Sequence, residues 1–531
     1  MTLRVFSPDP VHYDFDENGV PGFLLPLGQA ERAAFRDRLW LSLSTLCRSN
    51  EGNGFLLLSV IMNTVLADVL ALFMGVALQR RLAQENVKLV GGDRTQLWAA
   101  LSEGRTPPTP VNLDRMQRGF SQEAGLRRGL RHMRGWFTPR FPAVSAHSQV
   151  DFRRDIVSVT KDAIILQHAA GVDERIRLVS NLHWYRSLQA TDRAAFATAE
   201  HDAVCESFIS EVSAAFTAHG ENLNEANAVY LRRIVSGYLE LADRYLSRML
   251  KAPAGIPRRL WMTGGSSFLA RTLRLASRLN GGYVVAHDHG QGQAMAKGYH
   301  HVATELPLAD RFITYTALQA RISRQQMRVD MLPHVASPRI ESLPVEGRKK
   351  LLVEKFDRKA AQMTVMLMGT VFHDEHGNFT PMPPAISLVD WESRMIANLR
   401  QQGYRVIYKP HPESPYGFPE RYATVLGAEI ERARFEDCQH RADVIIFGFC
   451  WSTTLTLALQ LKKPIVIADM GYCHWSNAAL QHAQSRCAFL PAKLDEENRS
   501  MTDWRALPEA IERALILVNS DFVDDFFGLE V

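Results

Sequence analysis

The second half of the chain alternates short apolar runs with longer amphipathic runs, and this alternation limits the possible folds more than any other feature of the sequence. The apolar runs have the length of β-strands, helical patterns lie between most of them, and the loops are short. The predicted strands are Thr364–Met368, Tyr404–Lys409, Ala428–Glu431, Asp443–Phe447 and Ile465–Ala468. This order favours a parallel sheet with helices on both faces. We therefore expect an α/β domain over residues 341–531.

The first half contains a second set of strands, which predicts another α/β domain over residues 1–340. A strand within 258–265 leads through a helix to a strand within 281–290, and Asp310–Tyr315 supplies a further strand. The charged stretch 336–358 contains two prolines and is a candidate linker between the domains.

The N-terminal part of the first domain has a less regular pattern. We expect strands at Val20–Leu27 and Val87–Val90, a helix at Glu31–Cys47, and a long apolar helix from about Asn53. This order is consistent with α/β layering. Residues 191–251 have helical spacing throughout and predict a helical insertion.

The composition is that of an ordinary soluble protein. The chain has 531 residues, 46% of them hydrophobic, and its formal net charge of +4 does not suggest a nucleic-acid partner. The six cysteines lack metal-type spacing, and the N-terminus lacks the apolar core of a signal peptide. The apolar run Phe55–Leu78 contains Asn63 and Asp68, which favours a buried helix over a membrane span. We expect a cytoplasmic protein.

An arginine-rich stretch, Arg115–Arg140, follows a proline-rich break and is interleaved with apolar side chains. Such a stretch could lie on the inner face of a membrane or hold a polyanionic acceptor. A solvated helix face packed on the domain would explain the same pattern. The sequence leaves both interpretations open.

Polar residues gather directly after several predicted strands. Ligands of open parallel sheets bind beyond the carboxyl ends of the strands, so these residues are candidates for function. The sequence Tyr-Lys-Pro-His-Pro-Glu places His411 between two prolines, with Lys409 and Glu413 on either side. A fixed imidazole there can donate to a phosphate oxygen and offset the charge of a departing nucleotide. The structural alternative is a proline-rich turn whose histidine only packs.

Hydroxyl residues follow the predicted strand Asp443–Phe447 at the start of a helix: they are Ser452, Thr453 and Thr454. Free backbone N–H groups and the helix dipole favour an anion there, by about 0.3 to 1 kcal/mol for the dipole alone. We predict phosphate binding, with a simple N-cap role for Ser452 as the alternative. Another strand ends at Gly369-Thr370, where a glycine lets backbone amides approach a donor.

Together these motifs resemble those of bacterial surface-polysaccharide glycosyltransferases of the GT-B type, which have two Rossmann-like domains facing a cleft. The Lys-Pro-His-Pro sequence at 409–412 is similar to that of capsular Kdo transferases, sialyltransferases and CDP-glycerol polyol-phosphate transferases. The resemblance covers about residues 258–480. It implies a GT-B-like α/β fold with the nucleotide donor bound by the C-terminal domain.

The resemblance also implies roles for the His-Asp-His-Gly sequence that begins at His287. Either Asp288 or His289 is the expected base that deprotonates the acceptor, unless His287 and His289 are only structural residues. Gly265, Ser266 and His287 are expected on the acceptor side. The His-Asp-Glu-His-Gly sequence at 373–377 is expected to be a polar loop, without a metal ion.

The function implied by the resemblance is inverting, metal-independent transfer of a sugar from a nucleotide donor to a cell-surface glycan or glycolipid, as in capsule or lipopolysaccharide biosynthesis. A CMP-linked acidic sugar such as Kdo is the first candidate donor, and no separate cofactor is expected. The alternatives are a CDP-polyol phosphotransferase with the same site and a noncatalytic nucleotide-binding assembly protein. Asp288 is the expected base for a CMP-sugar and His289 for a CDP-polyol. The helix after Ser452 lacks the acidic residue of many relatives, which leaves the donor open.

Overall fold

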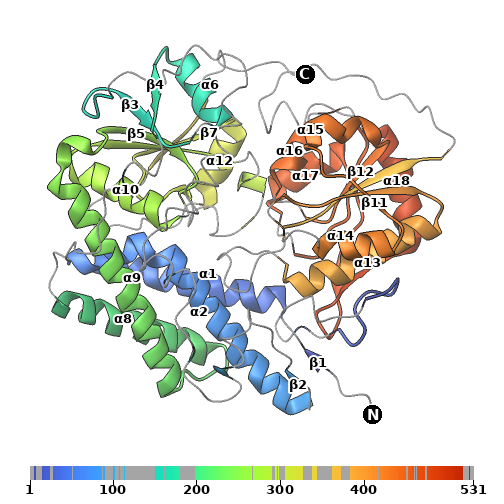
Figure 1. The fold of residues 1–531 in the computed structure, drawn as a ribbon, viewed down its shortest axis with the longest axis horizontal. Helices are drawn as coiled ribbons and strands as arrows, with labels where there is room; N and C mark the ends of the chain where they lie inside the picture. Colours follow the sequence, from blue (N-terminus) through green and yellow to red (C-terminus); the bar gives the residue numbers. More distant parts are fainter. Residues whose placement is uncertain are drawn as a thin grey trace.

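Two parallel sheets and a unit of long helices make up the protein (Figure 1). The described residues of the computed structural model are 5–6, 15–23, 25, 28–50, 52–85, 88–89, 100–101, 107, 113, 150–160, 162–179, 184, 198–265, 267–289, 293–295, 297, 305–326, 338–343, 362–371, 383–412, 414, 418–449, 452–459, 461, 463–472, 475–517 and 526.

The second half of the chain forms a six-stranded parallel sheet with the order β11-β10-β9-β12-β13-β14. The strands are β9 Thr364–Met368, β10 Arg405–Lys409, β11 Glu429–Ile430, β12 Val444–Phe447, β13 Ile465–Ile467 and β14 Ala488–Phe489. Every residue of β9 and β12 is buried, as expected for central strands covered on both faces. The chain builds outward from β9 on one side and then returns to its other side at β12. All five predicted strands of this half are confirmed.

Helices connect and cover these strands. The largest is α13, Ala385–Gln401, in which an unbroken run from Ile386 to Ile396 is buried. The other helices are α14 Phe418–Val425, α15 Phe435–Cys438, α16 Thr453–Leu459, α17 Asn477–Arg486 and α18 Leu507–Ile516. A short antiparallel pair, β15 Ala492–Leu494 and β16 Ser500–Thr502, is separate from the main sheet.

The first half contains a second six-stranded parallel sheet with the order β4-β3-β5-β6-β7-β8. Its strands are β3 Ile156–Ser158, β4 Ile176–Leu178, β5 Arg259–Thr263, β6 Tyr283–His287, β7 Arg311–Thr314 and β8 Arg339–Ser342. Its helices include α6 Ala163–Gly171, α10 Phe268–Leu279 and α12 Ala317–Gln326. The strand β8 lies inside the predicted linker 336–358, so the sheet extends past the predicted boundary at residue 340.

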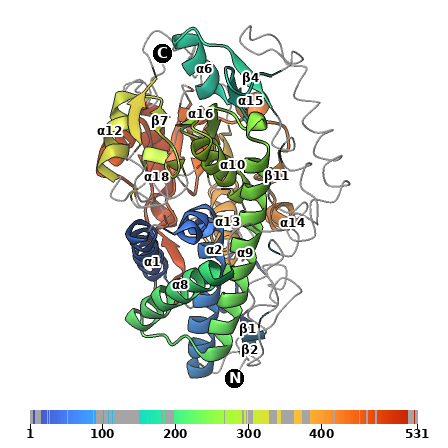
Figure 2. The ribbon, with the colours of Figure 1, turned by 90° about the vertical axis from the view of Figure 1, so that its left-hand side faces the viewer.

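The N-terminal helices do not belong to either sheet, which corrects the predicted α/β layering of the first 110 residues. The helices α1 Gln29–Ser49, α2 Asn53–Glu85, α8 Thr198–Ala218 and α9 Glu225–Lys251 pack together as a helical unit. Figure 2 shows α1, α2 and α8 below the sheets, with α9 running upward beside α10. The described residues of the predicted strand Val20–Leu27 are irregular. The second predicted strand is present as β2, Lys88–Leu89, but it pairs with β1, Val5–Phe6, in a separate two-stranded sheet.

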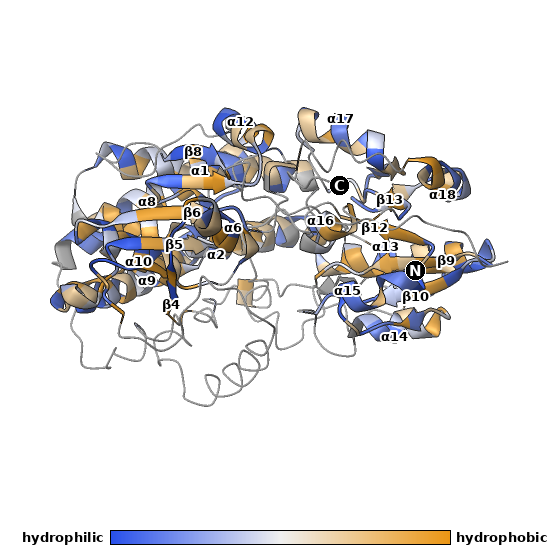
Figure 3. Ribbon diagram, turned by 90° about the horizontal axis from the view of Figure 1, so that it is seen from above, coloured by the Kyte–Doolittle hydropathy of each residue, from blue (hydrophilic) through white to orange (hydrophobic). Residues whose placement is uncertain are grey.

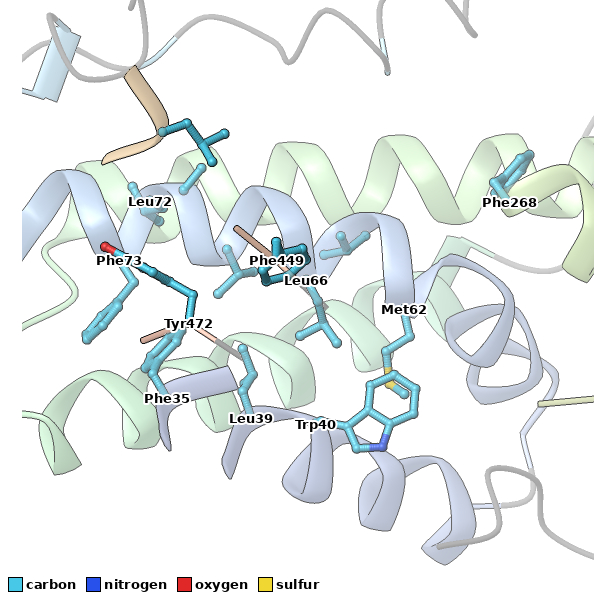
Figure 4. Close-up of a cluster of buried hydrophobic side chains, with 14 of the residues drawn as sticks. Phe35, Leu39, Trp40, Met62, Leu66, Leu72, Phe73, Phe268, Phe449 and Tyr472 are labelled. Carbon is cyan, nitrogen blue, oxygen red and sulfur yellow. The ribbon is translucent and has the colours of Figure 1, made fainter. Parts of the chain in front are cut away.

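The apolar helix α2 forms the centre of the helical unit. Over Gly54–Gln84 it is long and apolar enough to cross a membrane, yet 72% of its most apolar window is buried within the protein. Figure 4 shows Met62, Leu66 and Phe73 of α2 beside Phe35 and Leu39 of α1. Asp68 is buried in this packing and is hydrogen-bonded to Tyr238 of α9. Burial raises the pKa of the Asp68 carboxyl to about 7.

The two sheet-containing halves lie side by side, with hydrophobic strands inside each half (Figure 3). A contact between loops joins them: Ser476 N donates to Met295 O at 2.7 Å, and Ser476 Oγ donates to Ala294 O at 3.1 Å. Met295 belongs to the short helix η5, Gln293–Met295, which follows the carboxyl end of β6, and Ser476 follows the carboxyl end of β13. Loops after the strand ends of both sheets therefore meet at the interface, where ligands of parallel sheets bind.

Candidate functional site

A cavity of about 460 Å³ lies at the carboxyl ends of β9 and β10, next to the start of α16. Because β9 and β12 are the strands between which the chain reverses direction in the sheet, this is the topological switch point where ligands of open α/β sheets bind. The lining residues that the sequence predicted are Gly369, Lys409, His411, Ser452 and Thr454. Residues from three separate strand ends thus meet in one cavity.

The start of α16 contributes a hydroxyl and backbone groups to the cavity. Ser452 Oγ accepts a hydrogen bond from Thr454 N at 3.2 Å, so the side chain acts as a helix cap. Ser452 O also accepts from Leu455 N at 3.0 Å. The capping alternative therefore describes part of the role of Ser452, and its position on the cavity wall leaves ligand contact open. The side chain of Thr453 lies outside the described residues.

Lys409 lines the cavity and also binds the loop that follows β11. Its Nζ donates to Ala433 O at 2.5 Å, and Ala433 N donates to Glu431 Oε1 at 2.8 Å. Arg441 forms an ion pair with the same Glu431. The loop after β11 is therefore fixed by three charged side chains, and the ammonium of Lys409 has a structural partner as well as access to the cavity.

Two arginines of the same loop add positive charge at the cavity, and each has an acidic neighbour. Arg432 Nε lies 3.3 Å from Glu420 Oε1, and Arg434 Nη2 lies 3.2 Å from Glu436 Oε1. Both guanidinium groups are more than half exposed, so these pairs are weak and either arginine can rotate toward an anionic ligand. These arginines were not predicted from the sequence, because they alternate with acidic residues after β11 and form no recognised motif.

The predicted residues around β9 and β10 have different environments. His411 lines the cavity, and its backbone O accepts from Ser414 N at 3.0 Å. Gly369 also lines the cavity, whereas Thr370 is largely buried and its backbone N donates to Glu392 Oε1 at 3.0 Å. Thr370 therefore faces the interior. Glu413 lies outside the described residues.

The three predicted polar residues at the end of β6 differ in how far they are buried. His287 is fully buried, Asp288 is 1% exposed, and His289 is exposed. Nδ1 of His168 and Nε2 of His287 lie 2.9 Å apart, and the His168 ring stacks on Trp261 at 4.3 Å. Burial lowers the pKa of His168 to about 4 and that of His287 well below its ordinary value, so both rings are neutral at pH 7.

This burial corrects the acceptor-side prediction for His287. A fully buried ring paired with His168 has no surface with which to contact an acceptor, which matches the structural alternative for this residue. Asp288 N donates to Ile313 O at 2.9 Å and so ties the loop to β7. Of the two candidate bases, His289 is the one that solvent reaches.

The loop between β5 and α10 uses its polar groups internally. Gly265 N donates to Glu305 Oε2 at 3.3 Å, and Gly265 O accepts from Arg271 Nε at 2.9 Å. Glu305 and Arg271 are both buried. A carboxylate therefore occupies the place at this loop that an anionic ligand would take, and Gly265 is part of the core. Ser266 lies outside the described residues.

No group of three or more metal-ligating side chains is present among the residues that the structure describes. The predicted polar loop at 373–377 and the arginine-rich stretch Arg115–Arg140 lie outside these residues.

No protein-family model and no curated protein matches this chain. The sequence resemblance to GT-B glycosyltransferases therefore stays a prediction, and the geometry of the cavity is the main guide to function.

Proposed function

We propose that this protein is a glycosyltransferase that moves a sugar from a nucleotide donor, first of all a CMP-linked acidic sugar, to a glycan or glycolipid acceptor. The observation that carries the proposal is the cavity at the switch point of the second sheet. It gathers Gly369, Lys409, His411, Ser452 and Thr454, which the sequence had identified on three separate strand ends. Nucleotide phosphates bind at such positions in parallel sheets.

The size and charge of the cavity support a nucleotide as the ligand. A volume of about 460 Å³ lies within the range typical of sites for small molecules. Lys409, Arg432 and Arg434 outnumber the two lining carboxylates, Glu420 and Glu436, and this excess of positive charge would attract an anionic donor.

His411 and the start of α16 then have roles in the reaction. His411 donates to a phosphate oxygen and offsets the charge that develops as the nucleotide leaves. Ser452 and the backbone at the start of α16 add hydrogen bonds to the same phosphate. The acceptor hydroxyl approaches from the first half of the chain, where His289 is exposed on the loop that leads toward the interface.

Nucleotide titration of purified protein tests the proposal. Wild type, His411→Ala and the control His440→Ala are compared by calorimetry and thermal shift with CMP, CDP, UDP and GDP. His440 is an exposed histidine of the same half that is not among the cavity-lining residues. We expect selective binding of CMP, weakened by about 10- to 100-fold in His411→Ala because a hydrogen bond to a charged phosphate is lost, and unchanged in His440→Ala. Failure of the wild type to bind any nucleotide would refute the donor site.

The burial pattern after β6 favours a second candidate, a CDP-polyol phosphotransferase with the same cavity. Asp288 is almost fully buried and His289 is exposed, and His289 is the base that the resemblance implies for polyol-phosphate transfer. Release of CMP from CMP-Kdo and from CDP-glycerol distinguishes the two candidates. Turnover of CDP-glycerol that is lost in His289→Ala supports the second, and turnover of CMP-Kdo supports the first. Nucleotide binding without turnover of either donor favours a noncatalytic protein.

A further inference from the structure

A buried carboxyl on α13 connects the two strand ends that form the cavity. Glu392 is 1% exposed. Its Oε1 accepts from Thr370 N at 3.0 Å, and its Oε2 accepts from the hydroxyl of Tyr408 at 2.6 Å and from the hydroxyl of Tyr422. Thr370 follows Gly369 at the end of β9, and Tyr408 precedes Lys409 at the end of β10. One side chain therefore contacts both segments that carry predicted ligand-binding residues.

Two tyrosine hydroxyls hold one oxygen of Glu392. Tyr408 and Tyr422 both donate to Oε2, and their hydroxyl oxygens lie 3.0 Å apart, so the three oxygens form a closed triangle. Burial raises the pKa of Glu392 to about 7, whereas the hydrogen bonds from the two tyrosines and from Thr370 N lower it. These three donors fix the carboxyl between the ends of β9 and β10.

The same contact explains the glycine on the cavity wall. A Cβ at Gly369 would lie 2.5 Å from the hydroxyl oxygen of Tyr408 and 2.9 Å from its Cζ, so a side chain there would displace the tyrosine. Gly369 N also donates to Lys409 O at 2.9 Å. The side chain of Tyr408 therefore lies against Gly369 and reaches Glu392. Because of this contact, the end of β9 can lie this close to Tyr408 only with a glycine at position 369.

We propose that Glu392 is a positioning residue that fixes the ends of β9 and β10 at the spacing that the cavity needs to hold its ligand. It acts through Thr370 and Tyr408 and does not touch the ligand itself. The identity of the ligand as a nucleotide rests on the proposed function, whereas the positioning of the two strand ends does not.

Hydrogen exchange on the full-length protein tests the positioning role in peptides covering 364–371 and 405–412. The variants are Glu392→Leu and Glu392→Gln, with Asp390→Asn as the matched control. Asp390 is equally buried on the same helix but pairs with Arg394 and Arg499. We expect Glu392→Leu to speed exchange in these peptides by about tenfold. Glu392→Gln keeps an acceptor for Thr370 N and a side chain of similar size beside the tyrosines, so its exchange should lie closer to wild type than that of Glu392→Leu, and exchange in Asp390→Asn should match wild type.

Several outcomes would overturn the positioning role. Unchanged exchange in Glu392→Leu would show that the side chain does not fix the strand ends, and exchange in Glu392→Gln as fast as in Glu392→Leu would show that the hydrogen bond to Thr370 N does not contribute. If Glu392→Leu does not fold, Tyr422→Phe removes one corner of the triangle and should speed exchange in 405–412. Unchanged exchange in that variant would also contradict the proposal.

Titration of the same variants with CMP connects the positioning role to function. We expect Glu392→Leu to weaken CMP binding by about tenfold and Asp390→Asn to leave it unchanged. Equal weakening in both would contradict the proposal, because it would reflect a general loss of stability. If the wild type binds no nucleotide, the proposed function fails, and the exchange experiment still decides the role of Glu392.

Discussion

His287 and His289 lie two positions apart and have opposite environments. The first completes a buried strand and is paired with His168, and the second is exposed on the following loop. Their spacing alone could not distinguish them, because the point at which a strand ends decides which side chains leave the core. Lys409 shows the same limit: its place at a strand end was predictable, and its bond to Ala433 O was not. Burial and internal hydrogen bonds, which the sequence does not show, therefore decide how far each of these side chains can contact a ligand.

The pKa of Glu392 predicts a specific pH dependence of stability. Burial raises it from an ordinary 4.5 to about 7, so the folded state binds the proton more tightly than the unfolded state. The stability that this proton supplies is fully present below about pH 4.5 and is lost as the pH rises to about 7. We expect the free energy of unfolding of wild type, relative to Glu392→Gln, to rise by up to about 3 kcal/mol as the pH falls from 8 to 4.5. Urea denaturation at each pH measures this difference, and a constant difference would contradict it. Asp68 also titrates near pH 7 but is present in both proteins, so its contribution cancels.

At the scale of elements, the sequence predicts what is long or regularly repeated. The strands and helices of the second sheet alternate with short loops, so their positions followed from the pattern within one residue at the strand ends. In the first half, β3 and β4 were not predicted, because they lie outside the regular strand–helix alternation that revealed equally short strands such as β13. The strand expected at Val20–Leu27 has the right composition for a strand, but its described residues follow an irregular path along the second half.

Only part of the cavity was predictable from the sequence. Its lining residues follow strands and could be found by reading strand ends. Glu392 and Tyr422 could not, because they belong to helices and meet β9 and β10 only in the folded chain. The sequence offered no clear signal for Glu392, because the run from Ile386 to Ile396 also contains Asp390 and Arg394, and only the folded chain shows that the whole run is buried.

The burial of α2 predicts the result of truncating its side chains. Leu66 is fully buried, and Figure 4 shows it within the hydrophobic cluster. We expect Leu66→Ala to lower the free energy of unfolding by about 2 to 5 kcal/mol, because it removes buried methyl groups and leaves a cavity. Val425→Ala is the control, since Val425 is 70% exposed and its truncation should change stability by less than about 0.5 kcal/mol. Urea denaturation without detergent measures both. A similar small change in both variants would argue against α2 as a core helix.

At the scale of the whole molecule, the N-terminal segment and the helical unit join the two halves. Buried residues of α1, α2 and α9 belong to one continuous hydrophobic cluster with residues of β9 and α13. The guanidinium of Arg32 on α1 lies 5.6 Å from the ring centroid of Tyr472 in the second half. Near the C-terminus, Phe526 O accepts a hydrogen bond from Oγ1 of Thr316, a residue of the first half, at 3.0 Å. A helix near the N-terminus therefore contacts the second half, and a residue near the C-terminus contacts the first half. These contacts limit how freely the halves can separate.

The contact between Gly19 and Asp390 offers a test of this connection. Val20 N donates to Asp390 Oδ1 at 2.9 Å, and a Cβ at Gly19 would lie 2.3 Å from the same oxygen and 3.0 Å from the backbone O of Asp390. Gly22 also has a positive φ, but nothing lies within 4 Å of its Cβ position. We expect Gly22→Ala to cost about 1 to 2 kcal/mol from backbone strain alone. Gly19→Ala should cost more, because the methyl group also displaces the segment from α13. Urea denaturation compares the two costs, and limited proteolysis near residue 20 detects the displacement. Equal costs and equal cleavage would show that the N-terminal segment does not hold the second half, whereas faster cleavage in Gly19→Ala alone would establish it as a clamp between the halves.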